Sequence, residues 1–223
     1  RTAQLEAAVK ELEAFSYSVS HDLRAPLRAI DGFTRILVED YGPSLDAEGK
    51  RVCAVISDNT RRMGQLIDDL LAFSRLSRAD MQSFPIDMGV LAEAAFHQLT
   101  TRESRTRIDF RLGALPPAVG DPMLIGQVWV NLLSNALRHT PSGGWVRLAA
   151  REVAPEVELS VEDNGSGIAE PWVSQLGTPF VRPPDARPTE GHGLGLAIVK
   201  QVATMLGGRM RVESQVGRGT RVV

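Results

Sequence analysis

The stretch Ser20-His21-Asp22-Leu23-Arg24-Ala25-Pro26-Leu27 lies inside a run of apolar residues at helical spacing: Leu12, Phe15, Val19, Leu23, Leu27 and Ile30. At about 100° per residue, His21 points away from this apolar stripe, toward solvent or a partner. Asp22 can hold one ring nitrogen of the imidazole and leave the other as a nucleophile. Pro26 cannot donate to the carbonyl of Asp22, which loosens the helix beside the histidine. The stretch therefore predicts a reactive histidine on a helix, which another domain must reach.

The residues around this stretch predict a helical hairpin. Residues 1–40 form one helix, with coiled-coil spacing in its first part, and Tyr41-Gly42-Pro43 ends it. A second helix is expected from about Asp46 to Arg78, with an apolar heptad seam of Val52, Ile56, Asn59, Met63, Leu66, Leu70 and Phe73. The polar seam residue Asn59 sets the register if it is buried and means little if it is exposed. Because one hairpin has too little core to stand alone, two hairpins should pair as a four-helix bundle in a homodimer.

The composition is that of an ordinary soluble protein, with 223 residues, 43% hydrophobic and 23% charged. The formal net charge of -2 argues against nucleic acid as a partner. The single cysteine, Cys53, excludes an internal disulfide and fits a small apolar filler in a protein of a reducing compartment, the cytoplasm. No apolar run approaches the ~18 residues of a membrane span, and there is no signal peptide. The chain starts inside a helical pattern and stops inside a strand, so we expect a fragment of a longer protein.

The pattern changes after Ser83-Phe84-Pro85 to mixed helices and strands. Helices are expected over residues 88–101, 122–139 and 194–206. Strands are expected over residues 107–112, 145–151, 156–162 and 209–213 and from residue 220 onward. Residues 164–192 are rich in Gly and Pro and too long for an ordinary connection, which indicates a functional lid.

A polar face is predicted on the helix over residues 122–139. Asn131, Asn135 and Arg138 recur at i, i+4 and i+7, which places them on one side. Amide oxygens suit Mg²⁺, and a cation beside them suits phosphate. A plain solvated face is the alternative, but two Asn in an apolar helix are poor helix formers and disfavour it.

These stretches resemble sensor histidine kinases of two-component signalling. His-Asp-Leu-Arg-x-Pro-Leu is similar to their H-box, and Asn131 to Thr140 to the N-box of their ATP-binding domain, which gyrase and Hsp90 share. Asp163-Asn164-Gly165-Ser166-Gly167-Ile168 resembles the G1 box, Thr178-Pro179-Phe180-Val181-Arg182 the F-box, and Gly191-His192-Gly193-Leu194-Gly195-Leu196 the G2 box. A dinucleotide-binding loop is excluded for the last stretch, because no strand directly precedes it.

The resemblance implies a role for each group of residues. Asn135 is the metal ligand and Asn131 lies close to the metal and phosphates, while Asp163 accepts a hydrogen bond from the adenine amino group. Phe180 anchors the lid, although Leu176 replaces an aromatic residue often found before it. The other nucleotide-binding residues are Arg138, His139, Gly165, Gly167, Ile168, Arg182, Gly191, Gly193, Leu194, Gly195 and Leu196. His192 is taken as incidental.

The fold implied is α followed by α/β. A coiled-coil entry helix and a hairpin for dimerisation and phosphotransfer occupy residues 1–82, and an α/β sandwich of the Bergerat type that binds ATP and Mg²⁺ occupies residues 83–223. The function implied is autophosphorylation of His21, with Asp22 and Arg24 also in the catalytic set. The phosphoryl group then passes to an aspartate of a response-regulator receiver domain, and a sensor domain is expected before Arg1.

Two other functions compete with this one. The first is an ATPase related to gyrase or Hsp90, but Asn131 stands where those enzymes carry a glutamate that activates water. The second is a non-catalytic dimeric scaffold, which the intact boxes disfavour. Ala25 departs from the family, because many relatives carry Thr or Asn there to position the water that dephosphorylates the regulator. The methyl group predicts weak phosphatase activity, unless a water is held elsewhere.

Overall fold

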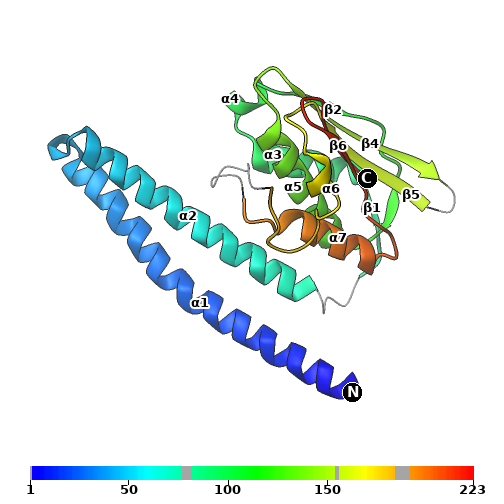
Figure 1. The fold of residues 1–223 in the computed structure, drawn as a ribbon, viewed down its shortest axis with the longest axis horizontal. Helices are drawn as coiled ribbons and strands as arrows, with labels where there is room; N and C mark the ends of the chain where they lie inside the picture. The colour runs from blue at the N-terminus through cyan, green and yellow to red at the C-terminus, as the bar shows by residue number, and fades with distance from the viewer. Residues whose placement is uncertain (1, 77–81, 154–155, 184–190) are drawn as a thin grey trace. The chain divides into compact units, whose positions relative to one another are not determined.

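The computed structural model describes residues 2–76, 82–153, 156–183 and 191–223, and only the backbone of residues 2–21, 72–76 and 156 (Figure 1). Contacts divide the chain into two compact units, Arg1–Arg78 and Ala79–Val223, here named the hairpin unit and the sheet unit. The boundary at residues 82 and 83 stays a prediction, because residues 77–81 lie outside the described ranges. No helix among the described residues is long and apolar enough to cross a membrane.

The hairpin unit consists of helix α1 (Thr2–Tyr41), a short 3₁₀ turn η1 (Gly42–Ser44) and helix α2 (Ala47–Leu76). Helix α1 continues through Pro26. The chain reverses where Pro43 enters η1, and Asp46 then caps α2 by accepting the N–H of Gly49 at 2.7 Å. The predicted helical hairpin is therefore confirmed.

The interior of the hairpin is narrow and partly polar. Two buried threonines satisfy their hydroxyls within their own helices: Thr34 donates to the carbonyl of Ile30 at 2.7 Å and Thr60 to that of Ile56 at 2.8 Å. Cys53 is buried and free, as a small apolar filler would be. Among the side chains of α1 and α2 that the structure describes, residues 22–41 and 47–71, the remaining buried ones are Leu27, Ile67 and Leu71, which form one cluster.

The first part of the predicted heptad seam is exposed, whereas Leu66 and Leu70 are half-buried and the side chain of Phe73 lies outside the described residues. Val52, Ile56 and Met63 are 42%, 38% and 51% exposed, and Asn59 is exposed with its amide bonded to the carbonyl of Val55 at 2.8 Å. Positions 53, 60 and 67 are buried instead, each one residue after a predicted seam position. A single hairpin thus keeps an exposed apolar stripe.

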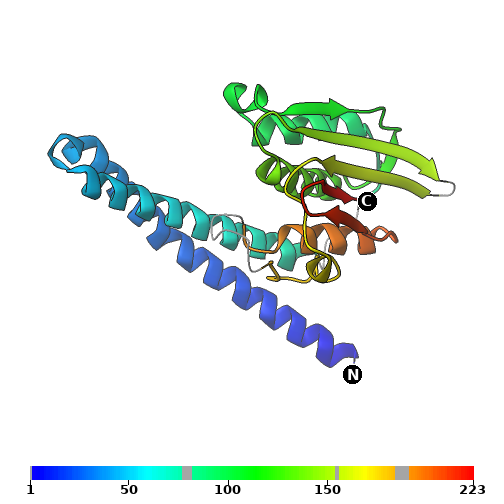
Figure 2. The same ribbon diagram turned by 45° about the horizontal axis from the view of Figure 1, so that its top comes forward.

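The sheet unit is built on a five-stranded sheet in the order β2-β4-β5-β7-β6. Strand β2 (Asp109–Leu112) is parallel to β4 (Trp145–Val153), and β5 (Glu156–Asp163), β7 (Gly219–Val222) and β6 (Val212–Gln215) continue antiparallel. Helices α3 (Met88–Leu99), α5 (Pro122–His139) and α7 (Gly195–Met205) lie on one side of the sheet (Figure 2). This is the expected α/β sandwich, with one face of the sheet left to solvent.

Side-chain alternation explains the two faces. Val146, Leu148 and Val161 are buried toward the helices, whereas Arg147 between them is exposed. Helix α5 is the centre of the core. Its buried residues are Leu124, Ile125, Val128, Trp129, Leu132, Leu133 and Ala136.

Four short elements were not predicted. Strands β1 (Phe84–Ile86) and β3 (Ala118–Gly120) form a separate antiparallel pair, and β1 lies at the predicted domain boundary. Helix α4 (Arg102–Arg105) starts at a capping box between Thr101 and Ser104, because Thr100 is extended and ends α3 early. Helix α6 (Glu170–Val173) lies in the predicted lid. The strand expected over residues 209–213 begins at Val212.

Candidate functional site

The polar face of α5 lies where the spacing predicted it. Asp121 caps this helix by accepting the N–H groups of Met123 and Leu124 at 2.9 and 3.2 Å. Asn131 and Asn135 are half-buried, whereas the intervening Leu132 and Leu133 are buried in the core. The side chain of Asn131 donates to the carbonyl of Gln127 at 2.8 Å, which leaves its Oδ1 as the acceptor.

The glycine-rich stretch before α7 closes onto this face. A Cβ atom at Gly195 would lie 3.0 Å from Oδ1 of Asn131 and 3.5 Å from Nδ2 of Asn135. Gly191 has a positive φ of 99°, and a Cβ atom there would collide with the guanidinium of Arg138. The first N–H groups of α7 therefore begin beside the amides of α5. Such a helix start attracts phosphate.

Asp163 ends β5 and is 8% exposed. Its Oδ1 accepts the N–H of Gly165 at 2.8 Å. Burial raises the pKa of Asp163, against the opposing effects of the backbone N–H groups of Gly165 and Thr220 and of the nearby His139. A buried carboxylate that keeps acceptor capacity suits a donor such as an amino group.

The loop after Asp163 is tied to two other elements. The N–H of Ser166 donates to the carbonyl of His139 at the end of α5, at 3.3 Å. The N–H of Ile168 donates to Oγ of Ser214 at 2.8 Å, and the N–H of Gly217 donates to the carbonyl of Ser166 at 2.7 Å. The loop from Asp163 to Ile168 is therefore held by β6 and the turn after it on one side and by the end of α5 on the other.

The predicted lid meets the glycine-rich stretch through its backbone. The N–H of Phe180 donates to the carbonyl of Gly193 at 3.1 Å. Phe180 has a φ of 64° and is 58% exposed as a residue, and the hydrogen bond that joins the two segments is a backbone one. Arg182 is half-buried, Leu194 is buried and Leu196 is half-buried, while residues 184–190 of the lid lie outside the described ranges.

The predicted catalytic residues of the hairpin unit lie on α1. The side chain of His21 is outside the described residues. Asp22 is exposed, and Arg24, one turn after the histidine, makes an ion pair with Asp68 of α2. The structure thus gathers the predicted nucleotide-binding residues in the sheet unit and keeps the predicted acceptor segment in the hairpin unit.

Sequence reasoning missed several residues that support the site. Ser214, Thr220 and Asp68 act from elements distant in sequence, and their types form no local motif. Asn164 was quoted without a role, and its Oδ1 accepts the N–H of Trp145 at 2.7 Å. An Asx residue beside glycines is the one signal that could have indicated this contact.

Two family models match the chain. Residues 11–79 match the His Kinase A (phospho-acceptor) domain, and residues 120–223 match the histidine kinase-, DNA gyrase B- and HSP90-like ATPase domain. Cyanobacterial phytochrome B of Nostoc sp. is 35% identical over 221 residues, which cover 97% of this chain and 29% of that protein. The histidine protein kinase DivJ of Caulobacter vibrioides is 33% identical over 225 residues, which cover 97% of this chain and 37% of DivJ.

Solved structures agree with these matches. Full-length ShkA in complex with AMPPNP superposes with a TM-score of 0.70 at 27% identity, over 94% of this chain and 44% of that one. The mycobacterial sensor histidine kinase MprB superposes with a TM-score of 0.55 at 31% identity, over 63% of this chain and 94% of that one.

Proposed function

The chain belongs to the sensor histidine kinases, with a phospho-acceptor hairpin and an ATP-binding domain, and we propose from this premise that it transfers the γ-phosphoryl group of ATP to His21 and then to an aspartate of a response regulator. The chain spans less than two fifths of phytochrome B and of DivJ, so this activity is assigned to the kinase core alone. The use of ATP as a substrate and the single free cysteine favour a location in the cytoplasm.

The observation that carries the proposal is the meeting of three segments in the sheet unit. Asn131 and Asn135 face the start of α7 at Gly195, and the loop after Asp163 is bonded to the end of α5. Phosphates would bind the N–H groups at the start of α7, where the guanidinium of Arg138 lies against Gly191 and Arg182 follows in the lid segment. The adenine amino group would donate to Asp163.

The donor set fits Mg²⁺ that is bound largely through nucleotide phosphates. Mg²⁺ is usually held by one or two protein ligands together with phosphates and water. Asn131 and Asn135 place two amide groups beside the start of α7, and among the described residues no group of three His, Cys, Asp or Glu could hold a metal ion. Asn135 would hold the ion, which neutralises charge on the β- and γ-phosphates when bound.

The chemical step assigned to the hairpin unit is an in-line displacement. A ring nitrogen of His21 forms a bond to the γ-phosphorus, the bond from that phosphorus to the bridging oxygen breaks, and ADP leaves. Asp22 orients the other ring nitrogen or takes its proton. Arg24 lies one turn away and is held by Asp68, so a cation stands close to the accepting histidine in the helix.

The exposed stripe of α2 supports a homodimer. Val52, Ile56 and Met63 would be covered when a second hairpin packs against the first, which gives the predicted four-helix bundle. Asn59 would then lie within the seam and select its register. The mass of the chain in solution, measured by light scattering, tests this part of the proposal.

Labelling with ATP that is radioactive in its γ-phosphate tests the activity. The full chain with Mg²⁺ should take up label that mild acid removes, because a P–N bond is acid-labile. His21→Gln should abolish the label, and the matched control His97→Gln, at an exposed histidine of α3, should retain it. Label that survives acid or persists in His21→Gln would refute the assignment. Steady release of phosphate without label would indicate the ATPase function instead.

A further inference from the structure

The outer face of the five-stranded sheet carries a row of charged residues. Cross-strand register aligns one residue from every strand, in the order β2 to β6: Arg111, Arg147, Glu162, Arg221 and Glu213. Their neighbours along β4 and β5, such as Val146 and Val161, are buried toward the helices, so this row faces away from the core.

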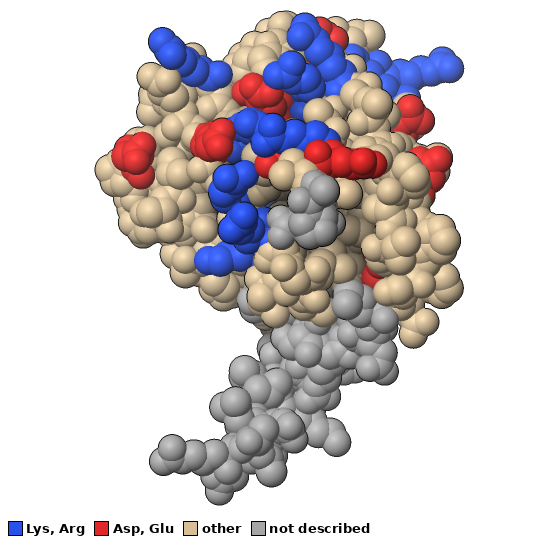
Figure 3. Space-filling view, turned by 90° about the vertical axis from the view of Figure 1, so that its right-hand side faces the viewer, with Lys and Arg blue, Asp and Glu red and all other residues tan. Residues whose placement is uncertain are grey.

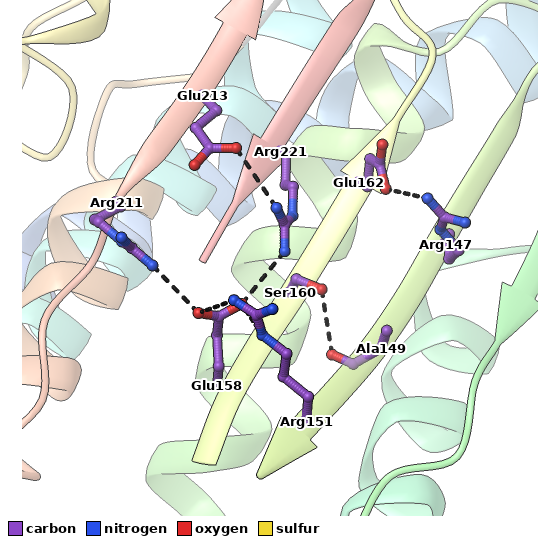
Figure 4. Close-up of polar contacts among 9 residues, drawn as sticks. All are labelled: Arg147, Ala149, Arg151, Glu158, Ser160, Glu162, Arg211, Glu213 and Arg221. Atoms are coloured by element: carbon purple, nitrogen blue, oxygen red, sulfur yellow. Dashed lines mark hydrogen bonds and ion pairs between the residues drawn. The ribbon is translucent and has the colours of Figure 1, made fainter. Parts of the chain in front are cut away.

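Arginines outnumber carboxylates around one point of this face. Glu158 of β5 is 13% exposed and accepts three guanidiniums, from Arg151 at 2.8 Å, Arg211 at 3.2 Å and Arg221 at 3.3 Å (Figure 4). Arg221 also lies 3.5 Å from Glu213. The hydrogen bond from Arg151 lowers the pKa of Glu158, which keeps this carboxylate ionised.

Most of the donors in this cluster are left for another acceptor. Each guanidinium carries five N–H groups, whereas one carboxylate offers about four acceptor positions. Arg151 and Arg211 are 65% and 55% exposed, so their remaining donors are accessible. The four arginines at positions 147, 151, 211 and 221 face three carboxylates, those of Glu158, Glu162 and Glu213, so this face keeps a net positive charge.

A shallow hollow lies beside the cluster. It is lined by the small residues Ala149 and Ser160 and by the charged residues Arg147, Glu162 and Arg221. Arg147 pairs with Glu162 at 2.5 Å (Figure 4). A carboxylate side chain from outside could therefore enter between guanidiniums without displacing a large residue.

We propose that the outer arginine face, defined as Arg147, Arg151, Arg211 and Arg221, docks an acidic segment of a protein partner. Carboxylates of that segment would take paired hydrogen bonds from the exposed guanidiniums. Lys and Arg side chains form a band across the side of the molecule that Figure 3 presents, with Asp and Glu beside it.

The interleaved carboxylates favour a polypeptide over a nucleic acid. Glu158, Glu162 and Glu213 are paired with arginines of this face, where they would repel a regular array of phosphates. A polypeptide can place acidic side chains opposite the arginines and neutral ones opposite the glutamates. The formal net charge of -2 agrees with this choice.

Fluorescence anisotropy with a labelled hexaglutamate peptide tests the proposal on the full chain. Excess Mg²⁺-ADP is added to occupy the nucleotide site. Arg151→Gln combined with Arg211→Gln should weaken binding by about 2- to 30-fold, the sum of two exposed ionic contacts. The matched control Arg102→Gln combined with Arg107→Gln removes the same charge on and just after α4, away from this network, and should change binding little.

A second variant is expected to change the affinity for the peptide in the opposite direction. Glu158→Gln removes the carboxylate that three arginines share, so the peptide should bind more tightly. Unchanged affinity for ADP shows that each variant is folded. Equal weakening in the cluster and control variants, or no tightening in Glu158→Gln, would overturn the proposal. Tighter binding of duplex DNA than of the peptide to the same arginines would overturn it as well. None of these measurements depends on kinase activity.

Discussion

The substitution Asp163→Asn tests two roles of this carboxylate in the sheet unit. One is recognition of the nucleotide, and the other is its effect on the stability of the fold. The carboxylate ends β5, is 8% exposed and accepts the N–H of Gly165 at 2.8 Å. Asparagine has nearly the same shape and keeps one acceptor for that N–H group. The substitution removes the negative charge and places an amide NH₂ where an oxygen would accept from the adenine amino group.

The expected loss of ATP affinity follows from one hydrogen bond to a charged acceptor. Such a bond contributes about 1.5–3 kcal/mol, which corresponds to about 10- to 150-fold in the dissociation constant. Titration calorimetry with an ATP analogue on the native chain and on Asp163→Asn measures this ratio directly.

The stability of the same variant should change with pH in a defined direction. Burial raises the pKa of Asp163 above its ordinary value of 3.8. The folded state therefore holds the proton more tightly than the unfolded state. Stability from this group is fully present below pH 3.8 and is lost as the pH rises through the raised pKa. Asp163→Asn has no carboxyl group to titrate and does not lose this stability. The free energy of unfolding of the variant should therefore increase relative to that of the native chain as the pH rises.

Urea denaturation followed by tryptophan fluorescence measures that difference. All three tryptophans, Trp129, Trp145 and Trp172, belong to the sheet unit, so the signal reports on this unit alone. Unchanged ATP affinity would refute the assignment of Asp163 to the adenine. A stability difference that is flat with pH, or that shrinks as the pH rises, would refute the reasoning about its burial.

Three further substitutions test separate parts of the molecule. Asn135→Asp adds a carboxylate beside the start of α7 and should impair the use of Mg²⁺-ATP without changing the mass of the dimer. Nucleotide affinity and mass by light scattering are measured on one preparation, and a monomer would contradict the division into two units. Asp22→Asn should keep ATP binding and lower the autophosphorylation rate by about 10²–10⁴-fold, measured by the rate of labelling; an unchanged rate would remove Asp22 from the mechanism. Ile67→Ala leaves a cavity beside Leu27 and should cost about 2–5 kcal/mol in the unfolding of the hairpin, followed by circular dichroism, with ATP affinity unchanged; a loss of ATP affinity would show that the two units are coupled.

The large elements could be predicted because their signals are local. Pro43 ends α1, Pro122 starts α5, and alternation along β4 and β5 marks a half-buried pair of strands. Strands β1 and β3 could not be predicted in the same way. Each has three residues, and Phe84 meets Gly120 only after α3 and β2 have intervened.

In the candidate site, too, the features set by local sequence could be predicted and those set by distant contacts could not. The spacing of Asn131, Asn135 and Arg138 predicted one helix face, because helix geometry relates residues within a few turns. The support from Ser214, across the sheet on β6, depends on a contact over 46 positions of sequence. Periodicity likewise located an apolar seam on α2 and could not decide whether α1 or a second hairpin covers it.

Ala25 should make this chain a weak phosphatase toward its regulator. Helix α1 is continuous from His21 to Ala25, which sets the two residues one turn apart, about 6 Å along the axis. Ala25 is exposed, so a regulator docked at His21 would meet its methyl group, which cannot hold a water. Ala25→Thr adds a hydroxyl and should speed dephosphorylation of the regulator by about 2- to 12-fold, the value of one net hydrogen bond. Ala29→Thr, exposed one turn further on, is the matched control and should have no effect. The native chain could already speed the dephosphorylation of the regulator well above the rate at which the regulator loses phosphate by itself. If Ala25→Thr then gives no further increase, a water is held elsewhere and this reasoning fails.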